Sequence, residues 1–294
     1  MVDATSRIVP PVRPEFELRD VADAQFGEVE RPLSAFERVW NQTWVRRATI
    51  VVVLAAVWEI YGRTLNNPLI FPAFSDVAQA FWHDFAKGPL LSRMLTTLQV
   101  LLLGYAAGLS LAAVFTTLAV STRFGNDLLS TLTAMFNPLP AIALLPLALL
   151  WFGLGIPSLV FVIIHSVLWA VALNTHTGFK SVSDTLRMAG QNYGLRGVSY
   201  VRKILIPAAF PSILAGLKIG WAFAWRTLIA AELVFGVSSR SGGLGWYIFE
   251  NRNLLETANV FAGLLTVIVI GLVVEGVIFR AIEARTVRRW GMQR

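Results

Sequence analysis

The feature that constrains this chain most is a series of apolar stretches, most of them long enough to cross a lipid bilayer as a helix. A spanning helix needs about 20 mostly apolar residues. Only 15% of the chain is charged and its mean hydropathy is +0.62, whereas a soluble domain is about 25% charged. We therefore expect an all-α, polytopic membrane protein with six transmembrane helices. Their approximate ranges are 48–61, 95–120, 128–152, 158–175, 211–237 and 257–282.

The third apolar stretch differs from the others because prolines interrupt it. Asn137, Pro138, Pro140 and Pro146 all lie within it. Proline breaks or kinks a helix, and non-helical backbone at membrane depth is tolerated where protein or a water-lined cavity covers it. This span is therefore a candidate pore element, with Asn137, Pro138 and Pro140 on the translocation path. The alternative is that the kinks serve packing alone.

The charges predict which side of the membrane each loop occupies. Residues 1–40 carry a net charge of −3 and residues 41–294 a net charge of +10. The basic residues gather at the ends of the apolar stretches, as topology determinants do, and not in a stripe that would bind nucleic acid. Six spans place both termini on one side. Assigning the Arg-rich ends to the cytoplasm puts the basic loop around residues 180–203 there too.

The chain divides by this pattern into three regions. Residues 1–43 are predicted to be a cytosolic tail followed by an amphipathic helix at the membrane interface, over about residues 33–47. The alternative for that helix is an ordinary segment leading into the first span. Residues 44–282 form the transmembrane domain, and residues 283–294 form a basic cytosolic tail. No signal peptide is visible, so we expect the first apolar stretch to be retained.

Motifs for catalysis and cofactor binding are missing from the sequence. The chain has no cysteine, which excludes disulfides and thiolate metal sites. It contains no GxxxxGK[ST] phosphate loop, no HExxH pair and no GxSxG elbow. We therefore expect a protein that is not an enzyme and needs no cofactor and no metal of its own.

One polar segment, RMAGQNYGLRGVSYVRKILIP over residues 187–207, carries a recognisable spacing. Gly194 is followed after nine residues by Ile204, and then after two more residues by Pro207. This spacing resembles the EAA loop of ABC-importer permeases. The segments FPAFSDVAQAF, NPLPAIALLPLALLWFGLG, NTHTG and WRTLIAAELV also resemble, in order, those of the nitrate, taurine, aliphatic sulfonate and bicarbonate importer family. The segment NTHTG is expected to open the central loop.

The resemblance implies a type I ABC importer permease fold in the bacterial inner membrane, with a cytosolic coupling loop over about residues 180–207. Implied partners are cytosolic ATPase subunits, which would hydrolyse ATP, an extracytoplasmic substrate-binding protein, a second permease copy and membrane lipid. The cargo would be a small anion, moved by alternating access. The alternative is a secondary transporter driven by an ion gradient, with His165, Glu232 or Glu275 as its proton site.

The expected coupling residues depart from the family pattern at two positions. Met188 and Gly190 stand where EAAxxxG has its Glu and second Ala. Two short helices bent at Gly194 are expected, with Pro207 ending the loop and Pro211 starting the fifth span. The residues assigned to the loop are Arg187, Met188, Ala189, Gly190, Gly194, Arg196, Ile204 and Pro207.

The fifth span holds two unusual charges, Arg226 and Glu232. An ionisable residue inside a span is costly and is a functional candidate. Six residues give about 600° of helical rotation, which leaves the two side chains roughly 120° apart, so they should not pair. Arg226 is expected either to line the translocation path, where it would favour an anion, or to pair with Glu275. The residues that share a stripe with Glu232 are Trp221, Trp225 and Leu228.

Overall fold

The computed structural model describes residues 34–235 and 242–289, and every regular element within them is a helix. The expected all-α fold is therefore confirmed. The chain divides into two compact units, Met1–Val53 and Leu54–Arg294. The elements are α1 (Ala35–Trp40), α2 (Thr43–Leu65), α3 (Phe74–Ala86), α4 (Leu90–Ser121), α5 (Arg123–Phe136), the 3-10 helix η1 (Ala141–Leu144), α6 (Leu145–Phe152), α7 (Ile156–Lys180), α8 (Asp184–Asn192), α9 (Gly197–Tyr200), the π-helix η2 (Val201–Leu205), α10 (Ile206–Phe235), α11 (Leu244–Asn253), α12 (Thr257–Val273), the π-helix η3 (Val274–Phe279), α13 (Arg280–Glu283) and the π-helix η4 (Ala284–Arg288).

The described part of the first unit contains α1 and the start of α2. Ser34 begins α1 with a capping box: its Oγ accepts from the Glu37 N–H at 3.2 Å, and its own N–H donates to Glu37 Oε2 at 2.8 Å. Asn41 then ends the helix as its C-cap. The prediction of one continuous amphipathic helix over residues 33–47 is wrong, because the helix is interrupted between α1 and α2. Residue 33 lies outside the described residues.

Within the described residues, five helical stretches are long and apolar enough to cross a membrane. They are α2, α4, α7, the run Val201–Val234 and the run Thr257–Arg288. A sixth span is complete if α5 and the segment Ala141–Phe152 count as one, and these two meet at an angle of 88°. The prediction that prolines break the third span is therefore confirmed.

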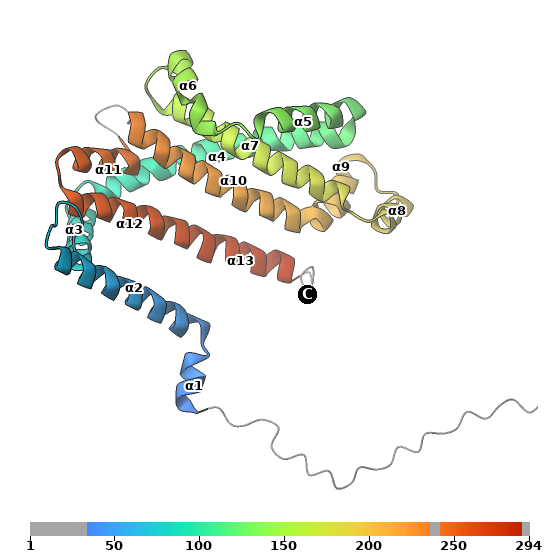
Figure 1. Cartoon of the computed structure of the whole chain (residues 1–294). Coiled ribbons are helices and arrows are strands. Elements are labelled where there is room, and N and C mark those ends of the chain that lie inside the picture. The colour runs from blue at the N-terminus through green and yellow to red at the C-terminus, as the bar shows by residue number, and fades with distance from the viewer. Residues whose placement is uncertain (1–33, 236–241, 290–294) are drawn as a thin grey trace, which may run out of the picture. The chain divides into compact units, whose positions relative to one another are not determined.

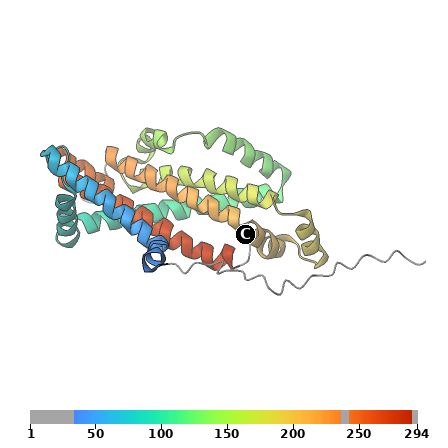
Figure 2. The same cartoon turned by 60° about the horizontal axis from the view of Figure 1, so that its bottom comes forward.

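Helix α7 forms the centre of the second unit and packs along both α4 and α10 (Figure 1, Figure 2). Two glycines bring α4 close to it. A Cβ added at Gly104 would lie 2.6 Å from Ile163 Cγ2, and one added at Gly108 would lie 2.7 Å from Val167 Cβ. Neither distance is compatible with a side chain, so the four-residue glycine spacing does allow close helix packing, as predicted.

Three predicted boundaries around the central loop are wrong. Helix α7 continues to Lys180, so residues 174–178 are helical and do not open a loop. Pro207 and Pro211 both lie inside α10, where they neither end the loop nor start a span. The π-helical turn η2 runs directly into α10. An irregular turn of this kind lets a helix continue where a backbone donor is missing.

The last span also extends further than its apolar pattern indicated. The helical run from Thr257 continues to Arg288, so residues 283–288 of the expected basic tail belong to it. Glu283 in this extension pairs with Lys218 of α10 at 2.7 Å. The basic end of the last span is therefore fixed to α10.

Candidate functional site

A short non-helical turn separates α5 from η1 and carries Asn137, Pro138 and Pro140. The Asn137 N–H closes α5 by donating to Thr133 O at 3.0 Å. Neither proline has an N–H to donate, so neither helix can run through the turn. This turn is the irregular backbone that the sequence predicted within the third span.

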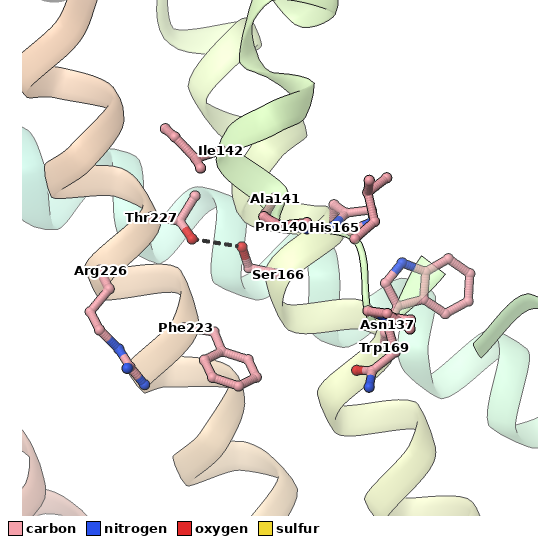
Figure 3. A pocket seen from close by; sticks show the side chains of 12 residues that line it. Asn137, Pro140, Ala141, Ile142, His165, Ser166, Trp169, Phe223, Arg226 and Thr227 are labelled. Carbon is pink, nitrogen blue, oxygen red and sulfur yellow. Dashed lines mark hydrogen bonds between the residues drawn. The ribbon is translucent and has the colours of Figure 1, made fainter. Parts of the chain in front are cut away.

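The turn forms one wall of a cavity of about 290 Å³, and side chains of α7 and α10 complete it (Figure 3). Four of the five residues predicted for the translocation path line this cavity: Asn137, Pro138, Pro140 and Arg226. Arg226 is far from the other three in sequence, so its position in the same cavity is a property of the fold. The other lining residues are Leu139, Ala141, Ile142, His165, Ser166, Trp169, Phe223 and Thr227.

Arg226 supplies the only formal charge among the lining residues. Its side chain is exposed, its Nε donates to Ala222 O at 3.0 Å, and its guanidinium carbon lies 5.3 Å from the centre of the Phe223 ring. None of the described carboxylates lies within ion-pair distance of it. The expected alternative, a pair with Glu275, is therefore not formed.

Polar side chains of α7 form another part of the cavity wall. Ser166 Oγ donates to Thr227 Oγ1 at 3.1 Å and so joins α7 to α10 (Figure 3). Both ring nitrogens of His165 and the Nε1 of Trp169 are buried and have no partner in the described part of the chain. Buried polar atoms without a partner call for an explanation such as water or a ligand.

These features define what the cavity can hold. A single cation, with no carboxylate among the lining residues, favours an anion. The rings of Phe223 and Trp169 and the proline-containing turn offer apolar contact to the rest of a ligand. The cavity therefore suits a small anion, including one with an organic part.

Glu232, the fifth predicted residue, does not line the cavity. Its side chain is fully buried, and Trp225 and Leu228, which share its helical stripe, are buried as well. Its carboxylate accepts from Thr97 Oγ1 at 2.9 and 3.1 Å and from the Gly245 N–H at 2.9 Å. Glu232 thus holds the first turn of α11 against α4 and α10.

Further contacts hold α11 in the same way. The Arg93 Nη1 donates to Gly242 O at 2.9 Å, and the same guanidinium pairs with Glu250 at 3.3 Å. The Tyr247 hydroxyl donates to Asp84 Oδ2 at 2.6 Å. Burial raises the pKa of Tyr247, and the hydrogen bond to Asp84 adds to the effect. Helix α11 is therefore joined to α3 and α4 by polar contacts.

The segment predicted to couple this chain to a partner forms two short helices, α8 and α9, with a bend between them. Gly194 lies at the bend with φ +70°, and Gly197 follows with φ +55°. Both values belong to the left-handed region that favours glycine. The prediction of two helices that bend at Gly194 is confirmed.

Close packing around position 190 gives a physical reason for the glycine there, where the family pattern has its second Ala. A Cβ at this position would lie 2.9 Å from Ile204 Cγ1 and 3.1 Å from the Tyr200 ring. Glycine therefore lets α8 pack closely against η2 and the end of α9. Arg187 fixes the start of α8, because its Nη2 donates to Phe179 O at 2.6 Å and its Nε donates to Val182 O at 3.0 Å.

The outer surface of this segment carries exposed apolar side chains. Met188 is 56% exposed and Tyr193 is 86% exposed, and Arg196 is exposed beside them in the bend. Ala189 is half-buried and accepts from the Tyr193 N–H at 3.1 Å. Pro207 lies in the first turn of α10, half-buried.

Several cavity residues were not predicted as site residues from the sequence. His165 was weighed only as a possible proton site, and Ser166, Trp169, Phe223 and Thr227 were not assigned to a path. The helical spacing of His165 and Trp169 shows that they share a face of α7. It does not show that this face meets the broken span.

A metal centre receives no support from the described residues. They contain no group of three or more His, Cys, Asp or Glu side chains that could hold a metal ion. His83 Nδ1 lies 3.1 Å from Asp84 Oδ1, but the same carboxylate also accepts a hydrogen bond from the Tyr247 hydroxyl.

Comparison with known proteins identifies the family. The family model described as "Binding-protein-dependent transport system inner membrane component" matches residues 101–288. A protein of Methanocaldococcus jannaschii named as an ABC transporter permease is 31% identical, over 79% of this chain and 87% of its own length. The taurine transport system permease protein of Escherichia coli K12 is 28% identical, over 80% and 86%. The nitrate import permease protein of Synechocystis is 26% identical, over 81% and 87%.

These matches bear on the two functions that the sequence left open. They extend over most of this chain and include both the cavity and the α8–α9 segment. The resemblance to importer permeases is confirmed. The alternative of a secondary transporter driven by an ion gradient receives no support from them.

Proposed function

Because this chain belongs to the family of inner membrane components of binding-protein-dependent transport systems, and is the permease subunit of an ABC importer, we propose that it carries a small anion through the cavity between the broken span, α7 and α10. Candidate anions are a sulfonate, taurine, nitrate, bicarbonate or a related organic anion. Taurine and nitrate appear in the names of two relatives. The chain is a multi-pass protein of the inner membrane.

One observation carries this proposal. Arg226 lines the same cavity as the Asn137–Pro140 turn, and no described carboxylate lies within ion-pair distance of it. A cation in a low-dielectric, partly apolar site attracts an anion more strongly than it would in water. The turn and Arg226 belong to different spans, so rigid-body movement of one span against the other would open or close the site.

The surface of α8 supports a docking site for a separate ATPase subunit. Met188 and Tyr193 are exposed there, and Gly194 sets the angle to α9. Tyr200 of α9 packs against a small buried apolar cluster that contains Phe179 of α7, Leu205 of η2 and Ala209 of α10. Movement of an ATPase bound to α8 would therefore be transmitted to these two spans, while ATP is hydrolysed on the partner.

The remaining parts of the proposal concern topology and assembly. With six spans, both termini would lie in the cytoplasm. Residues 1–43 would lead into the transmembrane region 44–282, and the basic residues 283–294 would follow it, the first of them as a continuation of the last helical run. The end of the molecule that carries α11 would then face a substrate-binding protein outside. A second copy of this chain, forming a homodimer, would complete the pore within the lipid.

The decisive experiment is to tag the chain in its native membrane, purify it gently and identify the proteins that accompany it. A stoichiometric ATPase and an extracytoplasmic binding protein are expected. The complex, reconstituted in proteoliposomes, should then take up an anion from a panel of nitrate, taurine, alkanesulfonates and bicarbonate only when ATP is present. Uptake driven by an ion gradient without ATP, or uptake of cations instead of anions, would contradict the proposal.

A further inference from the structure

A second, smaller cavity lies where α4 and α7 end. Its volume is about 190 Å³. Its polar lining consists of Asn126, His176, Lys180 and Arg187, and the rest of the wall is apolar. None of the lining residues is acidic. The function proposed above does not use this cavity.

The charges around the cavity are unbalanced. Lys180 and Arg187 form no ion pair with any described carboxylate. An adjoining hollow that shares Asn126 with the cavity adds one more cation, Arg123, and one carboxylate, Asp127. Asp127 is engaged by the Asn126 side-chain amide at 3.0 Å. The cavity is therefore positive even when Asp127 is counted against it.

Helix dipoles do not cancel this charge. The C-termini of α4 and α7 each carry about half a negative charge, so together they offset roughly one cation. Arg187 already donates to the carbonyls of Phe179 and Val182 beside the end of α7, at 2.6 and 3.0 Å. Its guanidinium is thereby held in place, while Lys180 is exposed and has no partner among the described residues. The site thus combines a fixed guanidinium with a free ammonium.

The surroundings of the cavity match the edge of a bilayer. It lies at the ends of two spans, and apolar side chains are exposed near its mouth: Leu118 is 40% exposed, Val120 39% and Phe124 72%. Val120 also lines the cavity. Basic pockets between spans on the cytoplasmic side bind anionic headgroups.

We propose that this cavity binds a phosphate group, carried by an anionic phospholipid of the cytoplasmic leaflet or supplied as inorganic phosphate. The assignment to the cytoplasmic leaflet rests on the topology proposed above. Arg187 lies in the first half of α8, so a phosphate held between Arg187 and Lys180 would brace the α8–α9 segment against the end of α7. Lipid composition would then influence the part of the chain that contacts the ATPase.

The test uses the purified full-length chain in detergent and compares three probes: phosphatidylglycerol, phosphatidylcholine and inorganic phosphate. Native mass spectrometry measures lipid retention, and the melting temperature reports on phosphate. Lys180→Gln removes the free cation without disturbing a contact, and Lys203→Gln is the matched control. Lys203 is an exposed lysine of η2 that does not line the cavity. Lys180→Gln should weaken phosphatidylglycerol binding roughly fivefold, the contribution of one basic residue near an anionic surface.

Each outcome decides the matter. Weaker phosphatidylglycerol binding in Lys180→Gln alone, with phosphatidylcholine unaffected, supports a lipid phosphate in this cavity. If inorganic phosphate raises the melting temperature of the wild type and displaces phosphatidylglycerol, the source is soluble phosphate. Equal losses in Lys180→Gln and Lys203→Gln, or no loss in either with any probe, would overturn the proposal. Arg187→Gln is a second variant, and it too should lose binding. The assay requires no transport, so it stands even if the proposed anion transport fails.

Discussion

Arg226 and Glu232 lie six residues apart on the same helix, yet their environments are opposite. Arg226 is exposed at a cavity and has no carboxylate partner among the described residues. Glu232 is fully buried, and three hydrogen-bond contacts from Thr97 and the Gly245 N–H surround its carboxylate. The roughly 120° of helical rotation between them turns one toward the cavity and the other toward α4 and α11.

The difference between these two environments shows how a charged residue within a span should be interpreted. Both residues are functional candidates by the rule that intramembrane charges are costly. The rule does not distinguish a charged group whose hydrogen bonds are satisfied within the fold from one whose hydrogen-bonding groups can still contact a ligand. Contacts separate them: Glu232 organises the polypeptide around it, whereas Arg226 presents its guanidinium to a space that a ligand can occupy.

The largest expected effect is on stability, from Glu232→Ala. Removing the carboxylate leaves the Thr97 hydroxyl and the Gly245 N–H without their acceptor. The variant should lose roughly 2–6 kcal/mol of stability, because each buried donor left unpaired costs about 1–3 kcal/mol. The measurement is the melting temperature of the purified chain in detergent.

Glu275→Ala is the matched control for this change. Glu275 is also a carboxylate within a span, but it is exposed and forms no ion pair in the described structure. Its removal should leave the melting temperature nearly unchanged. Equal destabilisation by both variants would mean that burial of Glu232 is not what sets the two carboxylates apart.

The next effect is on transport, from Arg226→Met. A hydrogen bond to a charged group contributes about 1.5–3 kcal/mol, so uptake should fall roughly tenfold to hundredfold. The melting temperature should hardly change, because Arg226 is exposed. Initial rates of ATP-dependent anion uptake in proteoliposomes measure the effect.

Arg252→Met serves as the control for Arg226→Met, since Arg252 is exposed on α11 and does not line the cavity. Its uptake should equal that of the wild type. Full uptake by Arg226→Met would remove Arg226 from the path. Loss of the folded complex in that variant would instead assign it a structural role, like that of Glu232.

Much of the fold was predictable because its signals are local. Apolar length identified the spans, Pro138 and Pro140 marked the break at 88°, and the four-residue spacing of Gly104 and Gly108 marked close packing. Local signals also misled. Pro207 and Pro211 would end a helix in isolation, but the helical run from η2 into α10 continues through both.

The site was less predictable because it depends on contacts between distant residues. The sequence indicated the Asn137–Pro140 turn and Arg226 separately, and the structure brings them to one cavity. The buried contact of Glu232 could not be predicted because Thr97, its partner, lies 135 positions earlier. No local pattern reports such a pairing. The function of Gly190 was likewise hidden until Ile204 and Tyr200 were seen against it.

A smaller effect on stability is expected from Thr97→Val. Valine has nearly the same shape but removes the donor to Glu232 and the acceptor for the Leu244 N–H, which lies 2.7 Å from Thr97 Oγ1. The cost should be about 1–3 kcal/mol. Thr96→Val is the control, because Thr96 only donates to Ser92 O in its own helix, and its effect should stay within about 0.5 kcal/mol. Melting temperatures that fall equally would show that the Thr97 contacts contribute nothing beyond helix packing.

The smallest effect should come from Glu232→Gln. The glutamine side-chain oxygen can still accept from Thr97 and from the Gly245 N–H, so the change should cost about 1 kcal/mol or less. Uptake and melting temperature should both stay close to those of the wild type, in contrast to Glu232→Ala. This variant gives the sharpest test of the comparison, because it keeps the shape and the acceptor while removing the ability to carry a charge. A variant that melts normally but no longer transports would show that Glu232 acts through its charge or proton, and the distinction between the two residues of α10 would then fail.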